Sequence, residues 1–183
     1  MKLILLEGGP VSGKNTLGTL LIEEFHKIGD NAILLDRDCY VEELNPKWVW
    51  ENERQKEKDL LNASITFTKD VNKYLQDNFV VIAIGEKLLT KADYVRFISR
   101  LKITCPIYLY HLNVPLSLRK RRFHKRGLHS LIDLEKDQKD RDAVKHWLGY
   151  VYENINTPKA DALNLMKLIQ NDKGLMNINK TKL

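Results

Sequence analysis

The feature that most constrains this chain is a glycine-rich loop close to its start. It follows the apolar run Leu3–Leu6 and precedes a segment whose large apolar residues recur on one helical face. It therefore joins a buried strand to an amphipathic helix. The spacing Gly8-x4-Gly13-Lys14 lets successive backbone N–H groups point at phosphate oxygens, and the lysine adds a positive charge. The sequence thus predicts a phosphate-binding loop, lined by Gly8, Pro10, Val11, Ser12, Gly13, Lys14, Asn15 and Thr16.

The residue after Lys14 departs from the usual form of such loops. Most of them have Ser or Thr there as a magnesium ligand, whereas this chain has Asn15, with Thr16 following. An amide oxygen binds Mg²⁺ weakly, and the ion readily keeps several waters. We therefore expect Asn15 to hold the metal through water.

The length of 183 residues and the 43% hydrophobic content suit one domain with one core. We expect this domain to span residues 1–170, with 171–183 as a polar, loosely held tail. The start has only four consecutive apolar positions, too few for a signal peptide or a membrane span, so we expect a cytoplasmic protein without membrane contact. Cys39 and Cys105 lie in no metal or redox spacing and are expected to be free thiols.

The net charge of +6 is concentrated in one place. Residues 119–126 carry six positive charges and no acid, which leaves 24 basic against 24 acidic residues elsewhere. Arg119, Arg122 and Arg126 recur at i, i+3 and i+7, so a helix would project all three from one face. Guanidinium groups bind phosphate oxygens bidentately. The pattern favours an anionic ligand over general adhesion to membranes or nucleic acid, although a run of basic residues is often only a solvated face.

Carboxylates follow two of the predicted strands. The run Ala32–Leu35 ends at Asp36-Arg37-Asp38, and the run Phe79–Ile84 ends at Gly85-Glu86. Ligands of open α/β sheets gather at the carboxyl ends of strands. Asp38 is our candidate to orient an acceptor hydroxyl and take its proton, unless the two aspartates only cap the next helix or lie in a solvated turn. Glu86 is a candidate for the magnesium shell, for contact with the acceptor, or for a structural role.

The remaining chain predicts helices and two more strands. Residues 41–78 are expected to be helical and polar, and residues 133–145 to form an exposed helix in which Asp140 and Arg141 are weaker candidates for the nucleotide. Trp48 and Trp50, close to the aspartates, could stack on a ring of the acceptor or fill the core. The last two strands are expected at Ile107–Leu112 and Tyr150–Asn154.

Taken together, these features resemble the P-loop kinases of the nucleoside, nucleotide and small-metabolite type over nearly the whole chain. The order Lys14-Asn15-Thr16 looks like that of the adenylate-kinase-like branch. The resemblance implies a three-layer α/β fold with a five-stranded parallel sheet in the order 2-3-1-4-5, and an arginine-rich lid at about 115–130. It also implies transfer of the γ-phosphate of ATP, with Mg²⁺, to a hydroxyl or phosphate of a small molecule.

The resemblance implies roles by position for Asp38, Arg122, Arg126 and the segment from Asn154 to Pro158, and together with the residues singled out above it completes the expected site. The catalytic set would be Lys14, Asp38, Arg122 and Arg126. The nucleotide would also be bound by Arg119, Asn154, Thr157 and Pro158. The acceptor would be bound by Asp36, Arg37, Asp38, Tyr40 and Glu86. Magnesium would be held, through water, by Asn15, Asp36 and Glu86.

Two short matches point to an alternative acceptor. Arg37-Asp38-x-Tyr40 and Arg122-x-x-x-Arg126-Gly127 look like motifs of the polynucleotide 5′-kinases. Those enzymes have an arginine shortly after the aspartate that grips the acceptor phosphate, and this chain has Val41 there. A small acceptor is therefore favoured over nucleic acid. A further alternative is a regulatory module that binds ATP without transferring phosphate. Asn15, which replaces the usual hydroxyl ligand of magnesium, is compatible with this alternative.

Overall fold

The computed structural model describes residues 1–127 and 132–176 of the chain. It contains one five-stranded sheet in the order β2-β3-β1-β4-β5, in which every neighbouring pair is parallel. This order confirms the predicted topology. The strands are β1 (Lys2–Gly8), β2 (Ala32–Asp36), β3 (Val80–Ile84), β4 (Ile107–Asn113) and β5 (Tyr150–Glu153).

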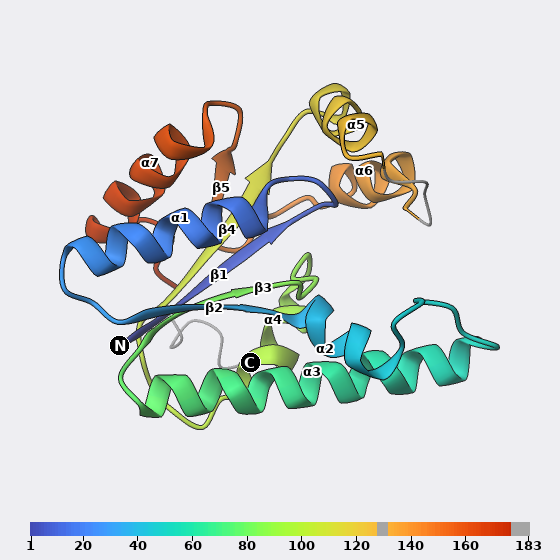
Figure 1. Cartoon of the computed structure of the whole chain (residues 1–183), viewed down its shortest axis with the longest axis horizontal. Helices are drawn as coiled ribbons and strands as arrows, with labels where there is room; N and C mark the ends of the chain where they lie inside the picture. The colour runs from blue at the N-terminus through green and yellow to red at the C-terminus, as the bar shows by residue number, and fades with distance from the viewer. Residues whose placement is uncertain (128–131, 177–183) are drawn as a thin grey trace.

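Helices cover both faces of the sheet, which gives three layers (Figure 1). On one face lie α1 and α7, and on the other lie α3 and α4, while α5 and α6 stand together beyond the carboxyl end of β4. The helices are α1 (Lys14–Lys27), α2 (Arg37–Leu44), α3 (Glu53–Gln76), α4 (Lys91–Ile98), α5 (Leu116–Lys125), α6 (Leu134–Asp142) and α7 (Pro158–Gln170).

The central strand β1 is apolar on both sides because both faces of the sheet are covered. Its side chains alternate between two cores: Ile4 and Leu6 pack on the α1/α7 side, and Leu3 and Leu5 on the α3/α4 side. This packing fixes the sheet so that β1, β2 and β3 end at one edge, where the predicted site residues lie.

The helical segment predicted at residues 41–78 is interrupted. Helix α2 ends at Leu44 and α3 begins at Glu53. Pro46 disfavours helical geometry in the residue before it, and Asn45 is accordingly extended, with φ −145°. The intervening loop, residues 45–52, extends beside the carboxyl edge of the sheet, below α5 and α6 in Figure 1.

The predicted tail is not loose at its start. Strand β5 pairs only with Tyr110–Asn113, which leaves the first half of β4 without a neighbour on that side. Residues 174–176 pair there instead: the Leu109 N–H donates to the Gly174 carbonyl at 3.0 Å, and the Met176 N–H to the Ile107 carbonyl at 2.7 Å. These bonds satisfy backbone groups that would otherwise be orphaned. Lid residues 128–130 and tail residues 177–183 lie outside the described residues.

Candidate active site

The glycine-rich loop lies between β1 and α1, as predicted. Gly13 has φ +95°, a conformation that favours glycine, and it turns the chain into α1. The Oγ of Ser12 is buried, and no group among the described residues forms a hydrogen bond with it. A loop with an unpartnered buried hydroxyl and N–H groups at a helix N-terminus fits the oxygens of a phosphate.

The Lys14 ammonium lies folded over this loop. Its Nζ donates to the carbonyl oxygens of Gly8 at 2.8 Å and Gly9 at 3.1 Å. Burial lowers the pKa of Lys14, while the charges of Glu7 and Asp38 act in the opposite direction. The lysine is therefore held against weak, neutral acceptors, which a phosphate could replace.

Asp36 and Asp38 have different surroundings. Asp36 is the N-cap of α2: its Oδ1 accepts the Asp38 N–H at 3.0 Å, and its Oδ2 accepts from Asn15 Nδ2 at 2.7 Å. Asp38 instead lines a cavity of about 900 Å³ together with Lys14 and Asn15. Burial, followed by the nearby charge of Asp36, raises the pKa of Asp38. The capping role predicted as an alternative thus belongs to Asp36, and Asp38 is the carboxylate that faces the cavity.

Glu86 lines the same cavity, and Ser64 and Arg37 hold its carboxylate in place. Its Oε1 accepts from Ser64 Oγ at 2.5 Å and lies 3.7 Å from the Nε of Arg37. Arg37 also donates to the Gly85 carbonyl at 3.1 Å, which ties the start of α2 to the end of β3. Tyr40 donates to Asp70 at 2.7 Å and does not line the cavity. Of the predicted acceptor residues, the structure therefore brings Asp38 and Glu86 to the cavity.

A second cavity, of about 390 Å³, lies on the other side of the loop. The described residues that line it are Val11, Gly13, Thr16, Leu17, Arg122, Lys125, Arg126, Asn154, Asn156 and Pro158. The Asn154 side-chain amide donates to the Ser12 carbonyl at 2.6 Å, which ties the loop after β5 to the glycine-rich loop. Thr157 caps α7. Five of the twelve predicted nucleotide residues thus line this cavity: Val11, Gly13, Thr16, Asn154 and Pro158.

Arg119 does not lie with Arg122 and Arg126. It is only 2% exposed and donates to Asp137 at 2.5 Å and to Gln138 at 2.6 Å, so it joins α5 to α6. A Cβ at Gly9 would lie 2.2 Å from the Arg119 guanidinium and 2.3 Å from Asp137, so a side chain there would have to displace this ion pair. Arg119 therefore packs behind the loop.

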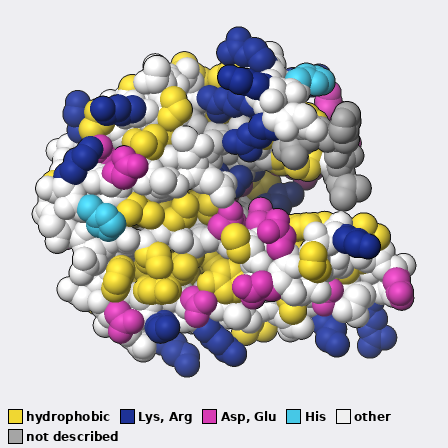
Figure 2. Space-filling model, in the orientation of Figure 1, with side chains coloured by type: hydrophobic (Ala, Val, Ile, Leu, Met, Phe, Trp, Pro, Cys, Tyr) yellow, Lys and Arg dark blue, Asp and Glu magenta, His cyan; other side chains and the backbone are white. Residues whose placement is uncertain are grey.

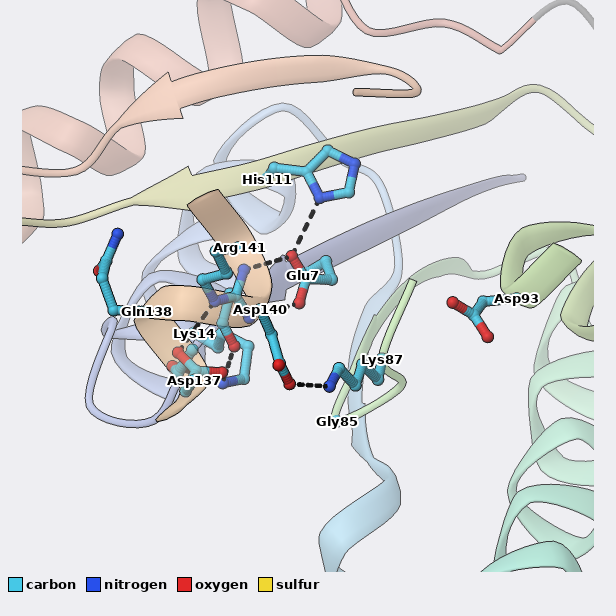
Figure 3. Close-up of polar contacts among 12 residues, drawn as sticks. Glu7, Lys14, Gly85, Lys87, Asp93, His111, Asp137, Gln138, Asp140 and Arg141 are labelled. Carbon is cyan, nitrogen blue, oxygen red and sulfur yellow. Dashed lines mark hydrogen bonds and ion pairs between the residues drawn. The ribbon is translucent and has the colours of Figure 1, made fainter. Parts of the chain in front are cut away.

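Sequence reasoning missed a buried ionic network beside the loop, whose members Glu7, Asp137 and Arg141 also line the 900 Å³ cavity. Glu7, the last residue before Gly8, accepts from Arg141 at 2.7 and 2.9 Å and contacts His111 Nδ1 at 2.9 Å (Figure 3). Arg141 also donates to Asp137 at 3.0 Å. Helix α6 was predicted to be exposed, but this network turns one of its faces inward. The signal available in the sequence was Glu7 itself, an acid at the end of an otherwise apolar strand.

The 900 Å³ cavity is the cleft visible at the right of Figure 2, between the α5/α6 pair and α2. An ion pair between Lys87 and Asp140, at 3.0 Å, joins the segment after β3 to α6 (Figure 3). Within residues 1–127 and 132–176, no group of three or more His, Cys, Asp or Glu side chains could hold a metal ion. No helix in the same ranges is long and apolar enough to span a bilayer.

No family model matches the sequence, and no curated protein matches it. Solved structures do resemble the fold. A sugar kinase from a Janibacter species is 13% identical with a TM-score of 0.65, and the match covers 93% of this chain and 95% of that one. Shikimate kinase from Acinetobacter baumannii, solved with shikimate, is 22% identical with a TM-score of 0.60, covering 94% of each chain. A chain of the Pnkp1/Rnl/Hen1 RNA repair complex is 18% identical with a TM-score of 0.57, covering 79% of this chain and 45% of that one.

These similarities, with the sheet order 2-3-1-4-5, show that the chain has the P-loop kinase fold.

Proposed function

We propose that this protein is an ATP-dependent phosphotransferase that moves the γ-phosphate of ATP to a hydroxyl of a small molecule. The observation that carries the proposal is that Lys14, on the phosphate-binding loop, and Asp38, a carboxylate with a raised pKa, line one cavity. A phosphoryl donor and a hydroxyl acceptor would meet there. The similarity in fold to a sugar kinase and a shikimate kinase supports this reading.

The residues present fit ATP and Mg²⁺. The loop N–H groups and Lys14 would bind the β- and γ-phosphates, and the 390 Å³ cavity beside Arg122 and Asn154 would take the nucleoside. The linked side chains of Asn15 and Asp36 supply oxygen atoms, the ligand type that Mg²⁺ prefers, and would hold the ion through water. When bound, the ion would neutralise charge that develops on the phosphate oxygens.

Each side chain has a defined task in the transfer. Asp38 accepts the proton of the acceptor hydroxyl as the new oxygen–phosphorus bond forms and the bond to ADP breaks. Its raised pKa makes it a better base than an exposed aspartate. The Lys14 ammonium stabilises the negative charge of the transferred phosphoryl group. Arg122 and Arg126 stabilise the same charge from the lid side.

The polynucleotide 5′-hydroxyl kinase remains a second candidate, because α5 carries the basic cluster and the fold is similar to a chain of an RNA repair complex. One observation weighs against it. Val41, at the position where those enzymes have an arginine, is fully buried, so that side of α2 faces the core. A regulatory module without transfer is disfavoured because Asp38 faces the cavity and is not engaged in capping.

The test is magnesium-dependent ADP formation from ATP with a panel of sugars, nucleosides and a 5′-hydroxyl oligonucleotide, with the Asp38→Asn variant as control. We expect at least one small acceptor to stimulate ADP formation in the wild type and not in the variant. Tight ATP binding with no acceptor-dependent turnover on any member would favour the regulatory module. Turnover on the oligonucleotide alone would favour the second candidate.

A further inference from the structure

The end of the cleft beyond Asp38 has aromatic walls. Trp48 and Trp50 are both half-buried and line the same 900 Å³ cavity as Asp38. Their rings meet edge to face, with centroids 6.0 Å apart and an interplanar angle of 85°. Neither belongs to the two apolar cores of the sheet. The core-filling interpretation of these indoles is therefore wrong, and they are part of the site.

The loop that carries the indoles is built to hold them in place. Trp48 has φ +53°, an uncommon conformation for a bulky residue. It is kept there by Asn45, whose carbonyl accepts the Trp48 N–H at 3.1 Å and whose side-chain amide donates to the Val49 carbonyl at 2.7 Å. Trp50 donates its indole N–H to Asp59 at 3.0 Å. Because that polar group is already satisfied, Trp50 offers a ligand mainly its apolar surface.

The opposite wall adds apolar surface from the lid side. Phe123 of α5 and Ile132, which precedes α6, line the same cavity. Polar and charged residues line it too, including the carboxylates of Asp38, Glu42 and Glu86 and the ammonium groups of Lys47 and Lys56. The lining of the cleft thus includes both the Asp38 carboxylate and the aromatic side chains of Trp48, Trp50 and Phe123.

We propose that the acceptor is a small hydroxylated compound with a planar aromatic ring, such as a nucleoside or an aryl glycoside. Its ring would stack in the section formed by Trp48, Trp50 and Phe123, and its hydroxyl would lie toward Asp38. Aromatic rings gain dispersion and quadrupole energy against indole faces, whereas a polyol buried there would lose hydrogen bonds to water. That this compound accepts a phosphoryl group rests on the proposed function. That the cleft binds a planar aromatic ring does not.

Binding is tested by tryptophan fluorescence without ATP. The chain has three tryptophans, and Trp147 lies outside this cavity, against His111. In a Trp147→Phe background all indole emission therefore reports on Trp48 and Trp50. The probes are two matched pairs that differ in the ring: uridine against ribose, and phenyl β-glucoside against methyl β-glucoside. We expect at least one ring-bearing member to change the emission saturably, and its ring-free partner to leave it unchanged at tenfold higher concentration.

Variants then locate the effect. Trp48→Ala or Trp50→Ala should raise the Kd of the ring-bearing probe about tenfold, the loss expected for one stacking contact. Trp48→Phe should retain most of the affinity. Leu61→Ala, an exposed apolar residue of α3 outside the cavity, is the matched control and should leave the Kd unchanged. Absence of binding by both ring-bearing probes, equal binding of the ring-free partners, or an unchanged Kd in both tryptophan-to-alanine variants would overturn the inference.

Turnover separates this inference from the proposed function. Phosphorylation of a ring-free acceptor with the same KM in Trp48→Ala and wild type would overturn the inference and leave the kinase intact. Stacking of a hydroxylated ring-bearing probe without ADP formation would contradict the kinase and leave the ring preference intact. If both are right, Trp48→Ala raises the KM of the acceptor and not that of ATP.

Discussion

Replacing Glu7 by Gln should destabilise the protein strongly, although the two side chains have nearly the same shape. Glu7 is 2% exposed and accepts hydrogen bonds from Arg141 at 2.7 and 2.9 Å. A glutamine there would remove one of the two carboxylates that pair with the partly buried Arg141 guanidinium, leaving Asp137, and would present an amide to His111. Removing one partner of a buried pair is costly because the other charge stays desolvated.

The magnitude follows from the pKa of Glu7. Burial by itself would raise this pKa, but hydrogen bonds and charge from His111 and Arg141 outweigh burial and lower it from 4.5 to about 2. One pKa unit corresponds to about 1.4 kcal/mol, so ionised Glu7 contributes about 3 kcal/mol at neutral pH. Because the folded-state pKa is depressed, this stability is present above pH 4.5 and is lost as the pH falls toward 2.

The assay is urea denaturation of wild type and Glu7→Gln between pH 7 and pH 3. We expect a difference in unfolding free energy of about 3 kcal/mol at pH 7 that narrows below pH 4.5. Glu135→Gln is the control, since Glu135 pairs with Lys120 in an exposed position and should contribute little. A difference as small as that of the control, or one that stays constant down to pH 3, would refute the reasoning.

The other predictions concern activity. Lys14→Ala should lose most phosphoryl transfer and bind ATP weakly while keeping its circular dichroism spectrum, and near-wild-type turnover would contradict the loop assignment. Asp38→Asn should lower kcat by roughly 10²-fold with little change in the KM for ATP. Wild-type kcat should fall as the pH drops through the raised pKa of Asp38, because the base must be ionised. A larger kcat loss in Asp36→Asn would reverse these roles. Arg122→Ala and Arg126→Ala should each reduce kcat and Lys at either position should rescue poorly, whereas equal activity of the Arg and Lys forms would indicate diffuse charge alone. The KM of the acceptor should depend weakly on salt, whereas a polynucleotide would show a log–log slope of about −0.7 for each phosphate contact.

The sequence by itself determined the features that depend on neighbours along the chain. Continuous apolar runs define the buried strands, and the spacing of Gly8, Gly13 and Lys14 defines the loop. Thr90 caps α4 in a reciprocal pair with Asp93, and Gly29, with φ +86°, turns the chain just after α1. Each of these features depends on backbone geometry over a few residues, so the local sequence pattern is sufficient to predict it.

Sequence position also placed Asp38 at the cleft, because strands of a parallel sheet end at a common edge. The sequence named Asp38 as the base and Asp36 as a residue for the acceptor and magnesium, but it could not say which of the two caps the next helix. Both follow the same strand, and their roles differ only through the Asn15 side chain and the helix N-terminus that engage Asp36.

Only the tertiary structure decided which charged residues are buried. Arg119 shares a helical face by spacing with Arg122 and Arg126, yet it packs against α6 because Asp137 and Gln138 lie there. Glu7 and Arg141 meet across 134 residues of sequence. Burying a charge costs desolvation free energy, which is offset here by a charged partner from a distant part of the sequence. No spacing along the chain encodes such a pair, since its members become neighbours only after the sheet and its helices have packed.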